Sequence, residues 1–313
     1  MSQVAIDKSS VVDKSGPRVR RMFGEIAEHY DRMNHLLSLQ VDRYWRWTTV
    51  RRLRPVPGEP ILDVCTGTGD LAIAFYRATG GRSPIVAADF CPQMLEVGRL
   101  KQARLRIGPE LTFVEADLQQ LPLENDRFSI VAVAFGLRNV ADTDRGLAEM
   151  VRVCRPGGQV AVLEFSTPRW QPLRAVYLFY FHRVLPRIGQ LLARNGSAAY
   201  EYLPATVAQF PEGEALAERM RAAGLGDVRF WPLTGGIATL YVGQKPPVDG
   251  AAACRKRPDR EKAPWQGKPL GPIFRWWLPS QAPAGPCTPS GCWNNCSRAA
   301  GKSTSSSVRP GPP

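Results

Sequence analysis

The chain has 313 residues, 44% of them hydrophobic, enough for one large domain or two small ones with a well-buried core. It contains no run of 18 or more uncharged apolar residues, and residues 1–20 lack the apolar centre of a signal peptide. These features argue against a transmembrane helix and a secretory leader, so we expect an intracellular, soluble protein. The net charge of +13 is compatible with binding to nucleic acid or to anionic lipid, and the charge alone does not distinguish these two partners.

The excess of positive charge is concentrated at the end of the chain. Residues 247–313 hold ten Lys or Arg against three Asp or Glu, and 26 of these 67 residues are Pro, Gly or Ser. Such a segment cannot bury enough apolar surface to offset its chain entropy. We therefore predict a flexible N-terminus over residues 1–17, a catalytic domain over 18–245 and a disordered basic tail over 246–313.

The first predicted element is an amphipathic helix over residues 18–37, where apolar residues recur every three or four positions. Strands and helices then alternate: strand 61–65, helix 70–79, strand 84–89, helix 92–105, strands 111–115 and 128–134, helix 144–154 and strand 159–165. Between the last two, residues 155–158 (RPGG) are typical of a helix stop and a turn. This alternation predicts an α/β fold, a parallel sheet with helices on both faces.

An aromatic-rich insertion, residues 173–193, follows the fifth strand and is predicted to form a helical cover over the strand ends. A last helix (212–223) and an antiparallel pair of strands (228–231 with 237–243) complete the domain. The apolar residues of the insertion either line a channel for a long greasy ligand or simply pack on the sheet. With Arg169, Arg174, Arg183 and Arg187 nearby, the first interpretation includes a peripheral contact with membrane headgroups.

The most informative segment is residues 61–70 (ILDVCTGTGD), which reads as a buried strand that breaks into a glycine turn and opens a helix. Gly67 and Gly69 let the backbone approach a ligand closely. The third glycine of the dinucleotide fingerprint is missing, because Leu71 and Ala72 follow. Since Asp63 and Asp70 bracket the turn with negative charge, we predict a cationic or neutral ligand rather than a polyphosphate.

A second acid, Asp89, ends the next strand 26 residues after Asp63, about the distance at which a carboxylate meets ribose hydroxyls. The two features together resemble class I S-adenosylmethionine-dependent methyltransferases, whose sheet is Rossmann-like. A purely structural glycine turn is the alternative interpretation.

Four further motifs make the resemblance specific: residues 22–34 (MFGEIAEHYDRMN), 135–140 (FGLRNV), 163–166 (LEFS), and 185–189 (LPRIG) with 200–203 (YEYL). In this order they closely resemble the ubiquinone/menaquinone biosynthesis C-methyltransferases, over residues 18–245. The resemblance implies methyl transfer from S-adenosylmethionine to a ring carbon of a prenylated hydroquinone, most readily demethylmenaquinol. Another lipid or phenolic acceptor, such as a sterol, is the alternative within enzymes.

The resemblance also implies roles for individual residues. At the acceptor ring it places Arg138 as electrostatic catalyst, with Asn139 and Tyr30 positioning the substrate. In a structural alternative, Arg138 merely caps a strand and pairs with Asp142 or Asp144. The cofactor residues it implies are Thr68 for the methionine moiety, Asp63 for the loop or the amino group, Gly67 and Gly69 for the turn, Asp89 for the ribose, Asp117 and Leu118 for the adenine edge, and the backbone of Ala134.

Other residues are weaker candidates. Asp117 is also interpretable as a turn carboxylate ahead of Leu121. Each of the three histidines (His29, His35 and His182) is more typical of a packed or solvent-facing residue than of a catalytic base. We predict no metal site, since the tail cysteines have no histidine or C-x-x-C partner. A nucleic-acid-binding function is disfavoured, because the aromatic residues cluster in one apolar stretch instead of alternating with Lys or Arg.

Overall fold

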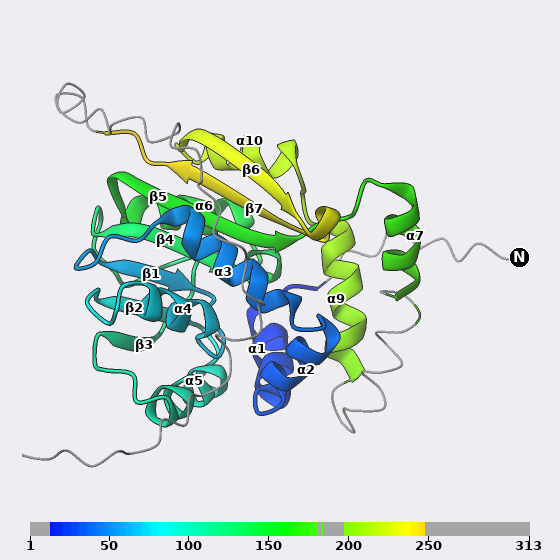
Figure 1. The fold of residues 1–313 in the computed structure, drawn as a ribbon, viewed down its shortest axis with the longest axis horizontal. Helices are drawn as coiled ribbons and strands as arrows, with labels where there is room; N and C mark the ends of the chain where they lie inside the picture. Colours follow the sequence, from blue (N-terminus) through cyan, green and yellow to red (C-terminus); the bar gives the residue numbers. More distant parts are fainter. Residues whose placement is uncertain (1–12, 181–182, 184–196, 248–313) are drawn as a thin grey trace, which may run out of the picture. The chain divides into compact units, whose positions relative to one another are not determined.

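The computed structural model describes residues 13–180, 183 and 197–247, and their centre is a seven-stranded sheet in the order β3-β2-β1-β4-β5-β7-β6 (Figure 1). The strands are β1 (Ile61–Val64), β2 (Ile85–Asp89), β3 (Leu111–Glu115), β4 (Phe128–Ala134), β5 (Cys154–Phe165), β6 (Gly226–Leu233) and β7 (Ala238–Gln244). β7 runs antiparallel to both of its neighbours, and the pairs among β1 to β5 are parallel. The α/β fold and the closing antiparallel pair predicted from the sequence are confirmed.

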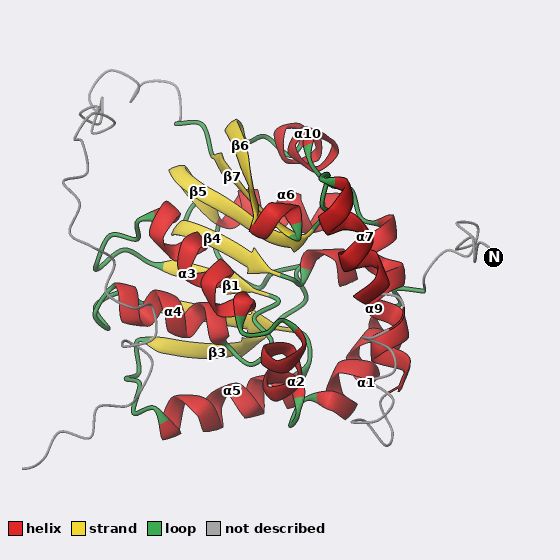
Figure 2. Ribbon diagram, turned by 45° about the vertical axis from the view of Figure 1, so that its right-hand side comes forward, coloured by secondary structure: helices red, strands yellow, loops and turns green. Residues whose placement is uncertain are grey.

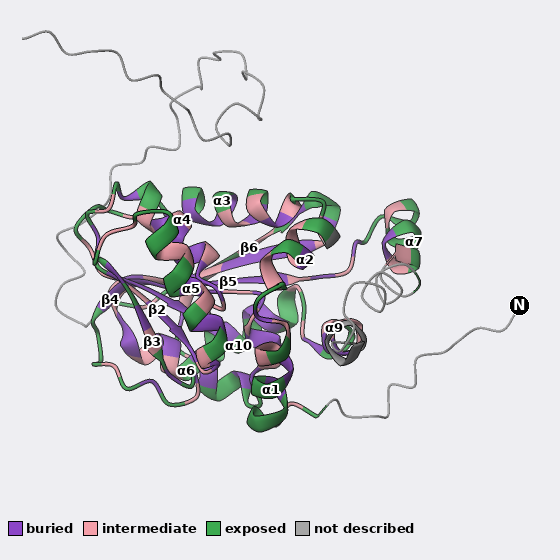
Figure 3. Cartoon of the chain, turned by 90° about the horizontal axis from the view of Figure 1, so that it is seen from below, coloured by how far each residue is buried: buried purple, intermediate pink, exposed green. Residues whose placement is uncertain are grey.

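Nine α-helices are described: α1 (Gly16–Ile26), α2 (Tyr30–Leu37), α3 (Val41–Leu53), α4 (Asp70–Ala78), α5 (Pro92–Arg104), α6 (Thr143–Val153), α7 (Gln171–Phe179), α9 (Ser197–Gln209) and α10 (Glu214–Ala222). α3 and α4 lie over one face of the sheet and α6 and α10 over the other, as Figure 3 shows. Within the described part of the chain, no helix has the length and apolar character that crossing a membrane requires.

The sheet is buried on both faces, which gives two apolar cores. One contains alternate residues of the central strands packed against α6 and α10, among them Leu62, Val131, Leu147 and Met220. The other contains the intervening strand residues packed against α3, α4 and α5, among them Ile61, Ile130, Phe75 and Leu95. This two-sided burial explains why the strands read as continuous apolar runs.

The helix predicted over residues 18–37 is two helices. The amides of Ala27, His29 and Tyr30 donate to carbonyls three residues earlier, and these tighter turns break the α-helical register between α1 and α2. The amphipathic period continues across the break, so the sequence pattern did not reveal it.

Two described helices were not predicted, α3 and α9. The buried face of α3 carries Asp42, Thr48 and Thr49 beside Trp45, so its hydrophobic period is weak. α9 contains Pro204 inside the helix, a residue that normally argues against a helical interior.

The segment after α6 also differs from the prediction. Residues 155–158 lie inside β5, where the register with β4 jumps from Phe128–Cys154 to Ile130–Gln159, so they form an irregularity within a strand instead of a separate turn. The predicted helical cover over residues 173–193 is confirmed where it is described, as α7. Residues 181–182 and 184–196 of that insertion, like the tail beyond residue 247, lie outside the described residues.

The order of strands changes direction between β1 and β4, and ligands of open α/β sheets bind beyond the carboxyl ends of strands at such a point. Helices α1, α7 and α9 lie beyond these strand ends in both views of the ribbon (Figures 1 and 2). The fold therefore places a helical cover over the sheet edge at which the sequence predicts the site.

Candidate active site

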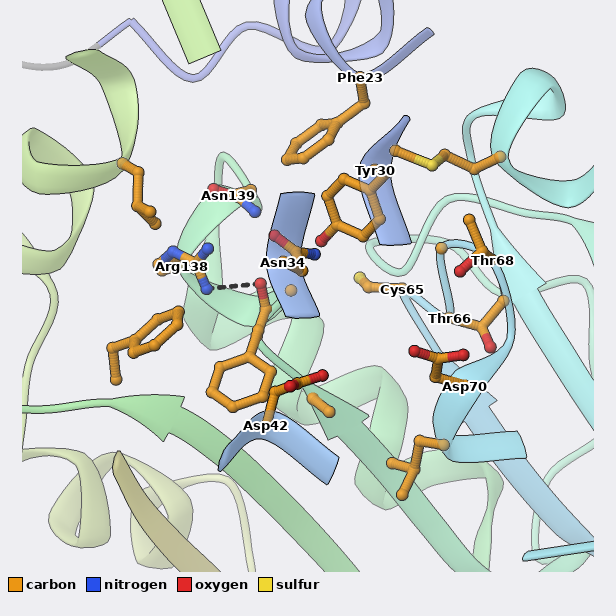
Figure 4. Close-up of a pocket in the computed structure, with 18 of the residues that line it drawn as sticks. Phe23, Tyr30, Asn34, Asp42, Cys65, Thr66, Thr68, Asp70, Arg138 and Asn139 are labelled. Atoms are coloured by element: carbon orange, nitrogen blue, oxygen red, sulfur yellow. Dashed lines mark hydrogen bonds between the residues drawn. The ribbon is translucent and has the colours of Figure 1, made fainter. Parts of the chain in front are cut away.

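A cavity of about 550 Å³ opens at this edge of the sheet. It is lined by ten of the eleven predicted site residues: Tyr30, Asp63, Gly67, Thr68, Asp89, Asp117, Leu118, Ala134, Arg138 and Asn139. Figure 4 shows Thr66, Thr68, Asp70 and Cys65 on one side of it and Arg138 and Asn139 on the other, with Tyr30 between them. The eleventh residue, Gly69, is not among the lining residues and packs elsewhere.

The glycine turn between β1 and α4 needs both of its glycines. Gly67 and Gly69 have φ angles of +57° and +83°, in the left-handed region that favours glycine. A Cβ built on Gly69 would lie 2.7 Å from the Phe113 ring, so this position also needs close packing. Gly67 instead borders the cavity, and its lack of a side chain leaves room there for a ligand while its amide donates to Asp89.

Two buried carboxylates, Asp63 and Asp89, organise the turn. Asp63 accepts from the Thr66 hydroxyl and from the Ala72 amide (3.1 Å), while its Oδ1 is buried with no hydrogen-bond partner among the described residues. Asp89 accepts from the Gly67 amide (2.8 Å) and the Cys91 amide (2.9 Å). Burial raises the pKa of Asp63 to about 7 and that of Asp89 to about 6. The hydrogen bonds to these carboxylates lower both pKa values, but by less than burial raises them.

These features fit a cationic, ribose-bearing cofactor. The unpartnered oxygen of Asp63 can accept a hydrogen bond from a ligand. A positive charge on that ligand would stabilise the ionised form of the Asp63 carboxyl group, which burial destabilises. The acids would repel a polyphosphate. The sequence-based prediction of a cationic or neutral ligand therefore agrees with the geometry.

The far end of the cavity, beyond β3, carries the residues predicted for the adenine edge. Leu118 is buried, and Asp117 is exposed at the rim. Asp117 accepts from the Gln119 amide (2.9 Å), which is the turn that the structural alternative predicted, and its carboxylate borders the cavity as well. Ala134 ends β4 in the cavity wall.

Arg138 lies in the short 3-10 turn η1 (Leu137–Asn139) directly after β4 and is only 5% exposed. Its Nη1 donates to Glu164 Oε2 (2.9 Å) and to the carbonyl of Phe135, and its backbone amide donates to Glu164 Oε1 (3.2 Å). Its guanidinium carbon lies 5.2 Å from the centre of the Phe165 ring. Arg138 is thus a fixed, buried cation whose partner is a strand residue.

The carboxylates that the structural alternative paired with Arg138 are engaged elsewhere, although Arg138 does cap the end of β4 at the Phe135 carbonyl. Asp142 caps α6 by accepting from the Arg145 amide (3.0 Å), and Asp144 pairs with Arg219 (3.4 Å). The Nε of Arg138 is buried and, like Asn139 Oδ1 beside it, has no hydrogen-bond partner among the described residues. A donor and an acceptor are therefore left over next to the cavity, the pair that a phenolic hydroxyl needs.

Tyr30 and apolar side chains complete the acceptor side. The Tyr30 ring packs edge-on against Phe23, with 6.1 Å between the ring centres, and burial raises the pKa of its hydroxyl. The remaining wall between α1, α7, α9 and β5 is apolar and is formed by Val19, Met22, Phe165, Leu173, Tyr177, Leu203 and Ile237. Such a surface excludes water from the reacting groups.

Sequence reasoning missed several charged residues at the site. Glu164 belongs to a motif that the sequence analysis singled out without assigning it a role. A second group links α2, α3 and α5 to the glycine turn: Asp31, His35, Asp42, Arg46, Asp70 and Lys101. The sequence analysis named Asp70 as bracketing the turn and His35 as a weak candidate base, but it gave the other members no role. The hydroxyl of Thr68 donates to Asp31 and accepts from Lys101 (3.0 Å), so it is engaged by this group. No local pattern marks Lys101, which reads as an ordinary basic residue on a helix.

The described histidines are not among the residues that line the cavity. His35 Nδ1 lies 2.8 Å from Asp42 Oδ2, and His29 is exposed at the start of α2. The side chains of His35, Asp42 and Asp70 converge as metal ligands would, but the guanidinium of Arg46 already contacts both carboxylates. His182 lies outside the described residues.

Residues 11–245 match the ubiE/COQ5 methyltransferase family. The chain belongs to this family. It is 42% identical over 234 residues to the ubiquinone/menaquinone biosynthesis C-methyltransferase UbiE of Geobacter sp. strain M21, covering 75% of this chain and 99% of that protein. It is 38% identical over 232 residues to the demethylmenaquinone methyltransferase of Bacteroides fragilis strain YCH46, covering 74% and 94%.

Solved structures show how widely the fold of this ubiE/COQ5 family member occurs. The [4+2]-cyclase SpnF is similar with a TM-score of 0.54 at 15% identity, covering 74% of this chain and 97% of that chain. The methyltransferase solved with the Haloferax volcanii Trm112 activator has a TM-score of 0.52 at 18% identity, covering 72% and 97%. Because one of them is named a cyclase, the fold alone does not decide the reaction. Family membership does, and it makes this chain a methyltransferase that uses S-adenosylmethionine.

Proposed function

We propose that this protein transfers a methyl group from S-adenosylmethionine to a ring carbon of a prenylated hydroquinone, with demethylmenaquinol as the preferred acceptor. The observation that carries the proposal is a single cavity that joins the acidic glycine turn to the buried guanidinium of Arg138 through an apolar wall. The relatives that are named for this chemistry match over the same residues. S-adenosylmethionine, when bound, supplies an electrophilic methyl group on a positively charged sulfur.

On the cofactor side, we assign the methionine amino group to the unpartnered oxygen of Asp63 and the ribose hydroxyls to Asp89. The backbone of Gly67 and of Ala134 borders the same part of the cavity, and Asp117 with Leu118 takes the adenine edge. Thr68 contacts the cofactor through its backbone, since its hydroxyl is engaged by Asp31 and Lys101. Gly69 acts indirectly, by allowing the turn to pack on Phe113.

On the acceptor side, the ring carbon becomes nucleophilic as its neighbouring hydroxyl gives its proton to water at the mouth of the cavity. The carbon takes the methyl group as the bond from that group to sulfur breaks. The ring hydrogen on that carbon then leaves as a proton and the oxygen is protonated again, so S-adenosylhomocysteine and one proton are released overall. The Nε–H of Arg138 donates to that oxygen and stabilises the developing negative charge, in a site where the apolar wall excludes water. Asn139 Oδ1 accepts from the hydroxyl beforehand and fixes its direction. Tyr30 packs over the turn and holds the ring in line with the methyl group.

The direct test is methyl transfer by the purified full chain, with labelled S-adenosylmethionine and detergent-solubilised demethylmenaquinol. We expect labelled menaquinol, and an Asp89→Ala variant with weaker cofactor binding in calorimetry. Asp227→Ala, which removes an exposed acid of β6, is the matched control and should bind as the original chain does. Methylation of a sterol or a simple phenol in preference to the quinol would establish the alternative acceptor class.

We further propose that the enzyme meets its substrate at an anionic membrane surface. Val176 of α7 and Leu39 both line the cavity and are 66% and 78% exposed, so apolar side chains frame its opening. Trp170 and Phe179 are exposed on or beside the same helix, and Arg169 and Arg174 add positive charge there. Exposed aromatic residues next to arginines suit the interface of a bilayer with anionic headgroups.

A further inference from the structure

Helix α2 covers the glycine turn but has little apolar anchoring of its own. A Cβ built on Gly67 would lie 3.9 Å from Cε1 of Tyr30, so the first residue of α2 packs directly on the turn. Among the described side chains of α2, only Met33 is buried. Burial of apolar surface therefore does little to hold this helix in place.

Polar contacts attach α2 instead: His35 near its end contacts Asp42 of α3 (2.8 Å), and Asp31 in its first turn contacts Lys101 of α5. Lys101, on α5, is 11% exposed, and its ammonium contacts Asp31 Oδ2 of α2 (2.5 Å), Asp70 Oδ1 (2.7 Å) and Thr68 Oγ1 (3.0 Å). An ammonium has three N–H donors, and each has an acceptor here. The hydroxyl of Thr68 in turn donates to Asp31 Oδ1. One side chain thus ties the covering helix to the end of the cofactor turn at which α4 begins.

The two ends of α2 are suited to movement. Before it, the tighter turns at residues 27–29 separate it from α1. After it, Leu39 and Gln40 have φ angles of +51° and +67°, two successive non-glycine residues in the left-handed region. Such a conformation costs energy and persists only where other contacts impose it. Here the amides of Leu39 and Gln40 donate to the carbonyls of Leu36 (3.1 Å) and His35 (2.8 Å), so a local turn that does not involve Lys101 joins α2 to α3.

We propose that Lys101 is a positioning residue that latches α2 over the bound cofactor, and that the latch opens when S-adenosylhomocysteine leaves. This inference rests on the proposed assignment of the cofactor to the glycine turn. With the latch closed, Tyr30 lies over Gly67. With it open, α2 swings away between its two ends and the turn is accessible. Product release is a frequent rate-limiting step where a lid covers the site.

The test is the Lys101→Met variant of the full chain, which keeps the length of the side chain and removes its charge. We expect S-adenosylhomocysteine to dissociate about tenfold faster in stopped-flow fluorescence, since lost contacts act mainly on the dissociation rate. Asp31→Asn should act in the same direction, and the double variant should release product no faster than the faster single variant, because both remove the same latch.

The matched control is Arg104→Met, which removes an exposed charge from the last turn of the same helix. Its release rate should equal that of the original chain. A second readout is limited proteolysis: bound S-adenosylhomocysteine should protect residues 27–29 and 38–40 in the original chain, and much less in Lys101→Met. A structural defect elsewhere would not produce that local difference.

An unchanged release rate in a Lys101→Met variant that melts normally would overturn the latch and leave the proposed function intact. Equal acceleration in Arg104→Met would overturn it as well. None of these measurements needs the acceptor, so a different acceptor leaves the result valid. Failure of the original chain to bind S-adenosylhomocysteine would overturn the proposed function, and the latch with it.

Discussion

The orientation of the Arg138 guanidinium is fixed by its buried ion pair with Glu164. Glu164 is 1% exposed and accepts from both the backbone and the side chain of Arg138. A buried pair costs desolvation energy that a pair of apolar residues would not, so its presence points to a role beyond stability. In the proposed mechanism that role is to aim a guanidinium at the reacting oxygen.

Variants of this pair separate stability from catalysis. Arg138→Leu and Glu164→Leu each leave one buried charge unpaired, and we expect each to lose about 3 kcal/mol of unfolding free energy. The double variant removes both charges and should recover most of that loss, while kcat stays at least about 100-fold down. Thermal melts and initial rates check this; a folded double variant with normal turnover would contradict the catalytic assignment.

Asp63 predicts a specific pH dependence. Its pKa is raised from 3.8 in the unfolded chain to about 7, so between these values the folded protein holds a proton that the unfolded chain has released. Asp63 therefore favours the folded state fully below pH 3.8, and this contribution is lost as the pH rises to 7. Asp89 shifts in the same direction, to about 6.

We expect Asp63→Asn to be more stable than the original chain at pH 8 by about 2 kcal/mol without cofactor, and equal to it near pH 4. Its affinity for S-adenosylmethionine should be about tenfold lower at pH 8, where the carboxylate of the original chain is ionised, and should change little between pH 8 and 7, since the remaining acid, Asp89, has a pKa of about 6. Denaturant melts and calorimetry across the pH range provide the measurement. An affinity that falls equally steeply with acid in both proteins would refute the role of Asp63.

At the scale of elements, the glycine turn combines two different requirements in three residues. Gly69 needs space, because Phe113 occupies the position of a side chain, whereas Gly67 needs only its backbone angle and its access to the cavity. Of the two glycines, Gly69 is therefore required for packing and Gly67 for access of a ligand to the turn.

Alanine variants should distinguish these requirements. Gly69→Ala should lose more than about 2 kcal/mol of stability from overpacking and backbone strain together. Gly67→Ala should lose about 1 kcal/mol from strain, and cofactor affinity in addition. Gly58→Ala is the control, with a φ of +92° and nothing within 4 Å of its Cβ, so it reports strain alone. Equal loss of affinity in Gly58→Ala would show that the effect is not local.

An element could be predicted from the sequence when neighbouring residues specify it, and not when contacts between distant residues do. The bounds of β3 and β4 match the prediction residue for residue, because apolar runs between turns specify buried strands. α3 escaped prediction because its buried face carries Asp42, Thr48 and Thr49, polar residues that interrupt the apolar period by which a helix is read from sequence. The partner of Arg138 escaped for another reason, since Glu164 is brought close by the β4–β5 register, which pairs Ala134 with Leu163.

At the scale of the whole molecule, the strand ends, the helical cover and the exposed apolar side chains around Val176 form one continuous path to the reacting groups. A prenylated acceptor with its tail in a bilayer can insert only its ring, which is compatible with a cavity of about 550 Å³. The fold thus suggests that the substrate need not leave the lipid completely.

The membrane proposal predicts that Trp170→Ala/Phe179→Ala binds vesicles containing phosphatidylglycerol several-fold more weakly than the original chain, since two exposed aromatic anchors are lost. Its activity on a water-soluble, short-tailed quinol should be unchanged. Leu100→Ala, an exposed apolar residue of α5, is the control. Cosedimentation measures the binding, and undiminished binding of the double variant would contradict the proposed surface.

The thiol of Cys65 has a consequence for a protein that holds a methylating reagent, because a free thiolate near that reagent would itself be methylated. Cys65 borders the cavity beside the glycine turn, where a thiolate would compete with the acceptor ring for an alkylating donor. Burial, with Asp89 and Asp63 next, raises the pKa of Cys65 well above its ordinary value, so the sulfur stays protonated. We expect prolonged incubation with the methyl donor alone to leave the Cys65 peptide unmodified in mass spectrometry, because burial first, and the neighbouring carboxylates second, hold its thiol in the unreactive protonated form.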